Sequence, residues 1–159
     1  MTNVESLPAS IISAIPRGAE AALDATMTHF DCQAGTVHWL GADGVLQLGA
    51  YRNLPPPIVS IIQTVPVGKG IAGLAAEKRE PVSLCNLQTD DTGRARPAAK
   101  TTGMEGSIAV PMLVAGDLRG VLGIAKSSAY DWNDAEKASL LHIASLLGEK
   151  RPELSAHDK

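Results

Sequence analysis

Apolar positions form two nearly continuous runs at residues 107–126, which flank the polar pair Gly116-Asp117. A two-residue turn of this composition joins the strands of a β-hairpin, so we expect a hairpin here. Closing it at this turn gives the cross-strand pairs Ala115–Leu118, Leu113–Gly120 and Pro111–Leu122. One face then carries Ala109, Leu113, Leu118, Leu122 and Ile124, and the other carries Ile108, Val110, Met112, Val114 and Val121. Since both faces are apolar, these strands are expected at the centre of a sheet covered on both sides.

A second hairpin is predicted from Thr36–Ala42 and Val45–Tyr51, which flank the turn signal Asp43-Gly44. The expected pairs are Trp39–Leu48 and Val37–Ala50. The apolar face would carry Val37, Trp39, Leu46, Leu48 and Ala50, and the mixed face Thr36, His38, Leu40, Gln47, Gly49 and Tyr51. A slip of one residue would exchange the two faces, because side chains alternate along a strand.

Helical spacing marks both ends of the chain. Ala22, Leu23 and Met27 form one stripe of a helix expected over Ala19–Phe30. A C-terminal helix begins after Asn133, which forms a capping box with Glu136, and it stops at Arg151-Pro152. Shorter elements lie between the hairpins. These are a helix after Pro55-Pro56-Pro57, a strand at Val65–Val67, a helix at Ile71–Lys78 and a strand at Pro81–Leu84.

This order of elements predicts an α/β (α+β) sandwich with a mostly antiparallel central sheet, because hairpins dominate it. The terminal helices would cover one face. The short helices and the long polar segment Asn86–Thr102 would cover the other face, where an irregular cover favours a small-molecule pocket. We expect an N-terminal arm or short helix at residues 1–16, a single domain at 17–150 and a disordered tail at 151–159.

Composition narrows the classes of partner. The formal net charge is −3 and no long basic run occurs, which argues against nucleic acid as the main partner. No apolar stretch is long enough to span a bilayer, and the N-terminus does not look like a secretory signal. The two cysteines, Cys32 and Cys85, and the histidines have no metal-ligand spacing. We therefore expect a cytoplasmic protein with reduced thiols, no bound metal and no membrane contact.

Several segments, taken in order, resemble the GAF domain family. They are Ala34–Val37 with Trp39-Leu40, Ala50–Pro55, Gly68–Gly73, Glu80–Val82, Gly106–Met112 and Leu118–Gly123. The resemblance covers residues 22–147 and implies a GAF/PAS-like sandwich in a stand-alone single domain. It also implies a sensory role, often in homodimers and often beside a kinase or transcription module. We expect the terminal helices to form such a dimer and the output to pass to a separate protein, such as a kinase or regulator.

The segment Gly68–Gly73 matches G-x-G-x-x-G, after a strand and before a helix. A dinucleotide site is not expected, because the helix is too short for a βαβ unit. Two interpretations stay open. The glycines can form a tight turn with close helix packing, or the free N–H groups of Gly70, Ile71 and Ala72 can bind an anion or carboxylate.

Other residues are candidates for ligand contacts or for simpler roles. Arg94, Arg96 and Lys100 could bring a cation to a ligand or form a solvated loop. Ser107 could donate a hydroxyl at the pocket mouth or simply begin a strand. Cys85 could be a redox thiol, an attachment point or a small buried side chain. The expected ligand-binding set is Tyr51, Ile71, Ala72, Cys85, Arg94, Arg96, Met104, Ser107 and Met112.

The sequence matches the motifs of catalytic and cofactor-binding members of this family less well. Free methionine-(R)-sulfoxide reductases carry several cysteines near this pocket, whereas the corresponding positions here are Gln63, Ala72 and roughly Arg96. Bilin-binding relatives often have Cys-His, but Gln33 and Asn86 follow the cysteines here. The Asn-Lys-Phe-Asp-Glu signature of cyclic-nucleotide relatives is absent. Haem would need an axial histidine, and residues 86–102 contain none.

We therefore predict a non-catalytic sensor that binds a small ligand, with an anion as one possibility. Its cofactor, if it has one, is not predicted. Two alternatives remain open. One is a thiol-dependent redox enzyme that uses Cys85. The other is an interaction module whose vestigial pocket is filled by Met104 and Met112.

Overall fold

The computed structural model describes residues 7–89 and 102–150. The described residues contain a six-stranded sheet in the order β3-β2-β1-β6-β5-β4, in which every neighbouring pair is antiparallel. The strands are β1 (Ala34–Leu40), β2 (Val45–Arg52), β3 (Thr64–Pro66), β4 (Val82–Leu84), β5 (Ser107–Val114) and β6 (Asp117–Ala125). The helices are α1 (Ala9–Ala14), α2 (Ala19–Phe30), α3 (Pro56–Ile61), α4 (Gly70–Lys78) and α5 (Asp134–Gly148), with a 3-10 turn at Ile15–Arg17.

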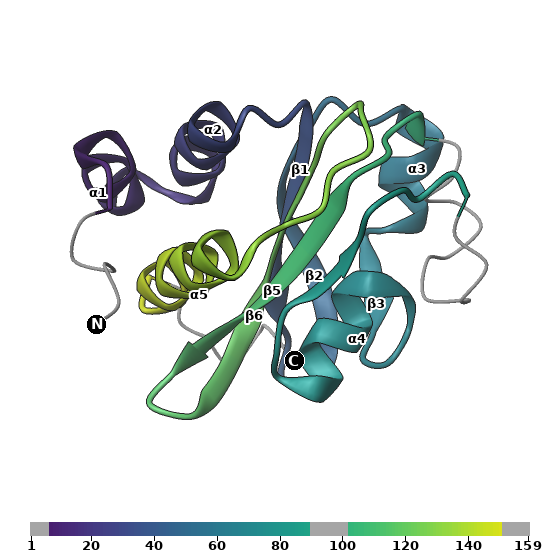
Figure 1. The fold of residues 1–159 in the computed structure, drawn as a ribbon. Coiled ribbons are helices and arrows are strands. Elements are labelled where there is room, and N and C mark those ends of the chain that lie inside the picture. Colours follow the sequence, from purple (N-terminus) through teal and green to yellow (C-terminus); the bar gives the residue numbers. More distant parts are fainter. Residues whose placement is uncertain (1–6, 90–101, 151–159) are drawn as a thin grey trace.

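The sheet is covered on both faces, as the two apolar faces of the central hairpin predict. Figure 1 shows α1, α2 and α5 on one side of the sheet and α3 and α4 on the other. The larger apolar cluster lies under the terminal helices, where Leu23, Leu140 and Ile143 are fully buried against the strands. A smaller cluster, centred on Leu46 and Ala75, lies under α4. The predicted sandwich is therefore confirmed.

The ends of the long helices follow from their sequence. Asn133 and Glu136 form the predicted capping box, in which the Asn133 side chain accepts from the Glu136 N–H and the Glu136 carboxylate accepts from the Asn133 N–H. The predicted bounds of α2 are confirmed at both ends. Ahead of it, α1 packs on α2, and Ile11 is buried in the larger cluster. The predicted tail at 151–159 and residues 1–6 lie outside the described part of the chain.

The central hairpin has a different register from the one predicted. Its turn is formed by Ala115 and Gly116, which both have positive φ (52° and 86°), rather than by Gly116 and Asp117. Val114 therefore pairs with Asp117 and Leu113 with Leu118. A bulge near Met112 shifts the remaining pairs by one residue, so Val110 pairs with Leu122. The predicted pairs Ala115–Leu118, Leu113–Gly120 and Pro111–Leu122 are wrong. The different register also changes which residues of β5 and β6 share a face of the sheet.

Alternate residues of β5 and β6 now separate cleanly between the two layers. Ile108, Val110 and Met112 share the terminal-helix side with Leu122 and Ile124. Ala109, Val121 and Leu118 belong to the cluster under α4. The predicted grouping had placed Leu122 and Ile124 with Ala109, and Val121 with Ile108, because it was built on the other register.

The first hairpin contains a β-bulge at Gly49. Val37 pairs with Ala50 as predicted, but Trp39 pairs with Gln47 and not with Leu48. A Cβ at Gly49 would overlap the Trp39 indole, so the ring lies directly on this glycine. Beyond the bulge, the β2 side chains point to the opposite face of the sheet from the one predicted. Leu46, predicted on the same face as Val37, packs instead in the cluster under α4.

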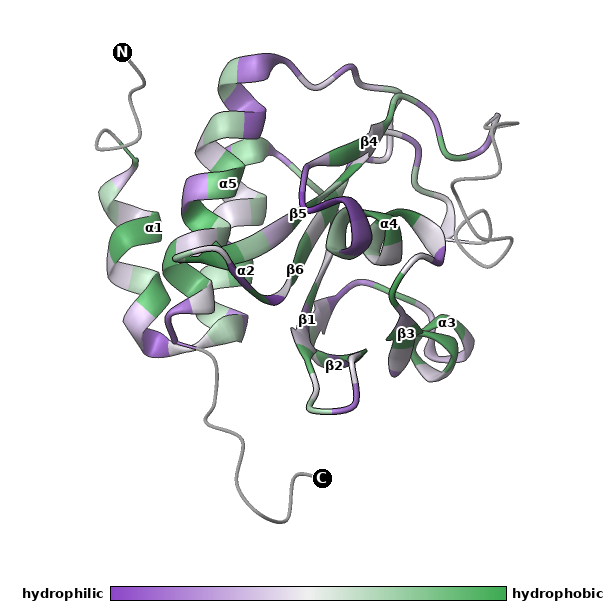
Figure 2. Ribbon diagram, turned by 90° about the horizontal axis from the view of Figure 1, so that it is seen from below, coloured by the Kyte–Doolittle hydropathy of each residue, from purple (hydrophilic) through white to green (hydrophobic). Residues whose placement is uncertain are grey.

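The sheet ends on both sides in short strands. β3 and β4 have three residues each, and β3 pairs only with Val45–Gln47 of β2. Figure 2 shows α3 beside β3 and α4 close to β4. The longer strands β1, β6 and β5 lie inside the sheet and form the floor on which the candidate site is built.

Candidate functional site

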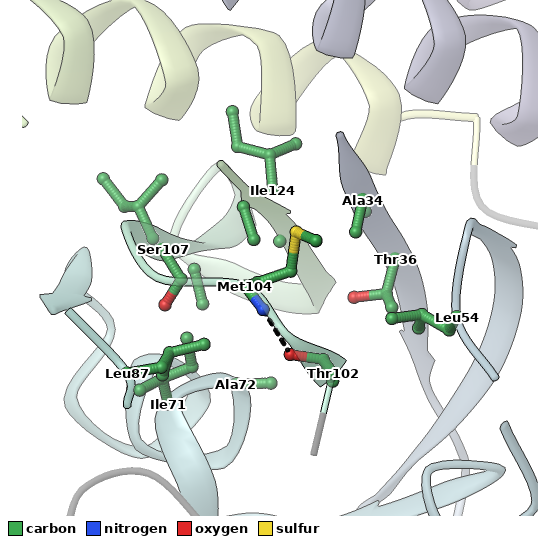
Figure 3. Close-up of a pocket in the computed structure, with 15 residues that line it drawn as sticks. Ala34, Thr36, Leu54, Ile71, Ala72, Leu87, Thr102, Met104, Ser107 and Ile124 are labelled. Atoms are coloured by element: carbon green, nitrogen blue, oxygen red, sulfur yellow. Dashed lines mark hydrogen bonds between the residues drawn. The ribbon is translucent and has the colours of Figure 1, made fainter. Parts of the chain in front are cut away.

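A cavity of about 120 Å³ lies between the sheet and the first turn of α4. Its floor comes from β1, β5 and β6, and its walls come from α4 and from the segments that precede and follow residues 90–101 (Figure 3). The lining residues are mostly apolar. They are Ala34, Gly35, Thr36, Leu54, Ile71, Ala72, Leu87, Thr102, Met104, Ser107, Ile108, Ala109, Gly123, Ile124 and Ala125.

Three hydroxyl groups border this cavity. Ser107 is 2% exposed, and its Oγ is buried with no hydrogen-bond partner among the described residues. Thr36 lies on β1 with its oxygen directed toward the middle of the cavity in Figure 3. The Thr102 hydroxyl accepts a hydrogen bond from the Met104 N–H at 3.1 Å. Because buried polar groups are nearly always paired, the Ser107 hydroxyl is the polar group that most needs a partner.

The first turn of α4 is brought close to the sheet by the glycines of Gly68–Gly73. Gly68 and Gly70 have positive φ (96° and 67°), and the Gly68 N–H donates to the Gly73 carbonyl at 2.8 Å. A Cβ at Gly73 would lie 2.5 Å from the Pro66 carbonyl oxygen, so only glycine fits there. The interpretation as a tight turn with close packing is confirmed. α4 leads into an antiparallel strand, so no βαβ unit is formed.

Leu87 and Met104 flank residues 90–101, which lie outside the described part of the chain. The Leu87 N–H donates to the Glu105 carbonyl at 2.8 Å, and the Gln88 amide donates to the Met104 carbonyl at 2.7 Å. These bonds hold the two flanking stretches, residues 87–88 and 104–105, together beside the cavity. Leu84, Leu87 and Met104 form a small apolar cluster there with Ile71 of α4.

Four of the sequence-predicted site residues line the cavity, namely Ile71, Ala72, Met104 and Ser107. Three do not. Tyr51 is 41% exposed on β2, Cys85 is exposed after β4, and Met112 is fully buried on the opposite face, in the cluster under the terminal helices. Arg94, Arg96 and Lys100 lie outside the described residues.

The sequence analysis missed Thr36, Leu54 and Leu87. Thr36 was placed on the mixed face of the first hairpin, and that face does point away from the terminal helices, so its position was available as a signal. Leu54 and Leu87 lie outside regular elements, where periodicity carries no information. Only the three-dimensional arrangement brings them to the cavity.

The two thiols are in different environments, and neither lines the cavity. Cys32 packs in the cluster under the terminal helices, and its Sγ is 3.8 Å from the Phe30 carbonyl oxygen. Burial raises the pKa of the Cys32 thiol to about 12, although the nearby Lys126 acts in the opposite direction. Cys85 is exposed. Cys32 is therefore a thiol, and not a thiolate, at neutral pH.

A buried histidine lies on the α4 side of the sheet. His38 is 2% exposed, and its Nε2 donates to the Ile62 carbonyl at 2.9 Å. Its Nδ1 has no partner among the described residues. Burial lowers the pKa of His38, while the bond to Ile62 opposes that shift. The ring is therefore neutral at pH 7 and contributes to the fold, away from the cavity lining.

Residues 7–89 and 102–150 contain neither a metal-ligand cluster nor a membrane-spanning helix. No group of three or more histidine, cysteine or acidic side chains there could hold a metal ion. No helix in the same ranges has the length and apolar character needed to cross a bilayer.

Comparison with known proteins identifies the fold. A family model described as a GAF domain matches residues 18–149. The GAF domain of a phosphoenolpyruvate-protein phosphotransferase from Acinetobacter is similar with a TM-score of 0.70 and 18% identity, over 87% of this chain and 86% of that chain. The GAF domain of such an enzyme from Coxiella burnetii has a TM-score of 0.68 and 20% identity, over 92% and 84%.

An enzyme shares the same architecture. Free methionine-R-sulfoxide reductase from Neisseria meningitidis, solved in complex with its substrate, has a TM-score of 0.66 and 15% identity, over 92% of this chain and 80% of that chain. At such identities the likeness shows the fold alone. No curated protein matches the sequence.

Proposed function

Since the chain belongs to the GAF domain family, we propose that it is a non-catalytic sensor domain. In this proposal it binds a small molecule in the cavity between α4 and the sheet and passes the signal to a separate protein. The family includes domains of signalling proteins, and a phosphotransferase domain is among the similar structures. The observation that carries the proposal is the cavity itself, which is apolar and is bordered by the Ser107 hydroxyl, a group with no hydrogen-bond partner among the described residues.

The cavity supports binding more than it supports a vestigial pocket. A vestigial pocket was expected to be filled by Met104 and Met112. Met104 lines the cavity without closing it, and Met112 packs on the opposite face of the sheet. An apolar space with few polar groups is the usual form of a small-molecule site.

A redox enzyme is the second candidate, because a free methionine-R-sulfoxide reductase has the same fold. A thiol mechanism needs a reactive sulfur at the bound substrate. Cys85 is exposed and does not line the cavity, and Cys32 is buried under the terminal helices with a raised pKa. Among the described residues the arrangement therefore favours binding without catalysis.

The route from cavity to partner follows the packing of the sheet. Ile108 and Ile124 pair across β5 and β6, which form the floor of the cavity, while their side chains pack on the other face in the cluster under α2 and α5. A ligand that favours one position of these two strands would therefore change how both side chains pack against the terminal helices. We include in the proposal a homodimer through the terminal helices, with a kinase or regulator as the partner.

Ligand binding is tested by mass spectrometry of the native, freshly purified protein together with the variant Ala72→Leu. Ala72 lines the cavity on α4, so leucine there occupies the space. The matched control is Ala135→Leu, an exposed position on α5. We expect a retained small molecule with the wild type and the control, and its loss with Ala72→Leu. Absence of any retained mass, together with no thermal shift across a metabolite screen, would refute the sensor function.

A further inference from the structure

We infer that the ligand is an uncharged, mostly hydrocarbon molecule of roughly six to eight non-hydrogen atoms with one oxygen atom that Ser107 binds. This inference rests on the proposed function and names the chemical class that the same cavity accepts. It follows from three properties of the cavity, namely its volume, the chemistry of its lining and the position of its unpaired hydroxyl group.

The volume sets the size of the occupant. The cavity measures about 120 Å³. A protein cavity of about 150 Å³ lined by leucine, isoleucine and phenylalanine binds benzene. The cavity here is slightly smaller and is lined by side chains of the same kind, including Leu54, Ile71 and Leu87. A single small ring or a short branched chain fits the part of the pocket that the described residues enclose.

The lining disfavours a charged ligand. No described lining residue carries a charged side chain, and leucine, isoleucine, methionine and alanine side chains provide most of the walls. Moving a carboxylate from water into such a space without a cationic partner costs several kcal/mol, far more than moving a hydroxyl group that regains a hydrogen bond. The anion interpretation of the α4 N-terminus therefore lacks the cationic side chain that it would need among these residues.

The polar atoms favour an oxygen on the ligand. The Ser107 Oγ has no partner among the described residues, although the side chain borders the cavity and is 2% exposed. A hydroxyl can both donate and accept, so a single ligand hydroxyl or carbonyl satisfies it. Ile71 and Ala72 lie in the first turn of α4, where backbone N–H groups favour an acceptor atom, which is again met by oxygen.

The test uses three probes of similar shape. Toluene and phenol have the same number of non-hydrogen atoms and differ in a methyl against a hydroxyl group, and benzoate adds a negative charge. Binding to the full chain is measured by the methyl NMR shifts of Leu54, Ile71, Leu87 and Met104, which line the cavity. Each titration is repeated with Ser107→Ala, which removes only the hydroxyl oxygen.

Phenol and toluene are expected to shift these methyl signals, and benzoate is expected to bind at least tenfold more weakly than phenol. Ser107→Ala should weaken phenol relative to toluene by roughly fivefold to tenfold, the usual effect of one neutral hydrogen bond. Two results would overturn the inference while leaving the proposed function intact. These are tighter binding of benzoate than of phenol, and an equal effect of Ser107→Ala on both neutral probes.

The probe comparison in the wild type does not depend on the variant. If Ser107→Ala failed to fold, the order of phenol and benzoate would still decide between a neutral and an anionic ligand. If no probe shifted the methyl signals and native mass spectrometry also found no bound molecule, the cavity itself would not be a binding site, and the proposed function would fall with the inference.

Discussion

The side-chain ammonium of Lys126 donates a hydrogen bond to the backbone carbonyl of Phe30, the last residue of α2. The same nitrogen lies 3.2 Å from the carbonyl oxygen of Asp31, which is in the left-handed conformation that ends the helix. It also lies 4.6 Å from the centroid of the Tyr130 ring and 5.5 Å from that of Trp132. One cation at the end of β6 thus joins the C-terminus of α2 to the segment before α5.

We predict that Lys126→Met lowers the free energy of unfolding by about 1–2 kcal/mol. Methionine keeps the apolar stem but removes the charge that binds the α2 carbonyls and the two aromatic rings. Urea unfolding followed by circular dichroism gives the value. Lys78→Met, at an exposed position in the last turn of α4, is the control and should change stability by less than about 0.5 kcal/mol. Equal effects of the two variants would contradict a special role for Lys126.

Acid should destabilise the protein through His38. Burial lowers the pKa of this group from the usual 6.5, so below that pH the unfolded chain takes up a proton that the folded protein does not. The stability contribution of neutral His38 is therefore complete above about pH 6.5 and is lost as the pH falls. The slope approaches about 1.4 kcal/mol per pH unit at most.

Urea unfolding between about pH 5 and pH 8 measures this effect. His38→Gln, which cannot titrate, should flatten the pH dependence even if it lowers stability at every pH. A wild-type stability that stays constant down to pH 5 would contradict the assignment of a buried neutral ring.

The two thiols should differ strongly in reactivity. A disulfide reagent at about pH 8 is expected to modify one thiol per native chain quickly, because Cys85 is exposed, whereas burial raises the pKa of Cys32 to about 12. Cys85→Ser should remove the fast phase, and both thiols should react in urea. Fast modification that persists in Cys85→Ser would mean that Cys32 is accessible.

Gly49→Ala should destabilise the first hairpin. The added methyl group would overlap the Trp39 indole, so the ring must move away from the strand. We expect a loss of roughly 1–3 kcal/mol and a change in tryptophan fluorescence. Ser60→Ala, at an exposed position on α3, should have little effect on either measurement. An unchanged fluorescence spectrum in Gly49→Ala would contradict the stacking of Trp39 on this glycine.

The fold could be predicted well where local sequence decides the structure. The bounds of α2 follow from its apolar stripe, and the start of α5 follows from the capping box of Asn133 and Glu136. The two hairpins also follow from their turn signals. Their registers could not be predicted, because a bulge at Gly49 and a positive φ at Ala115 depend on packing against Trp39 and the neighbouring strand, not on a local preference.

The site could be predicted in part for the same reason. Ile71, Ala72, Met104 and Ser107 stand beside recognisable turns and strand starts, and the structure brings them together. Met112 and Ser107 are an odd number of positions apart on β5, so their side chains point to opposite faces of the sheet and only Ser107 lines the cavity. Which face of the central hairpin carries the cavity depends on how the helices pack, and that is not encoded in the alternation along one strand.

The three-residue outer strands have a consequence for assembly. A sheet recruits another chain by backbone pairing only where a long, flat edge offers free N–H and C=O groups. Here one boundary strand ends in Pro66, which has no N–H to donate, and both boundary strands are too short to template a neighbour. Pairing of another chain along β3 or β4 is therefore disfavoured, which favours contacts with other proteins through side chains on the helices.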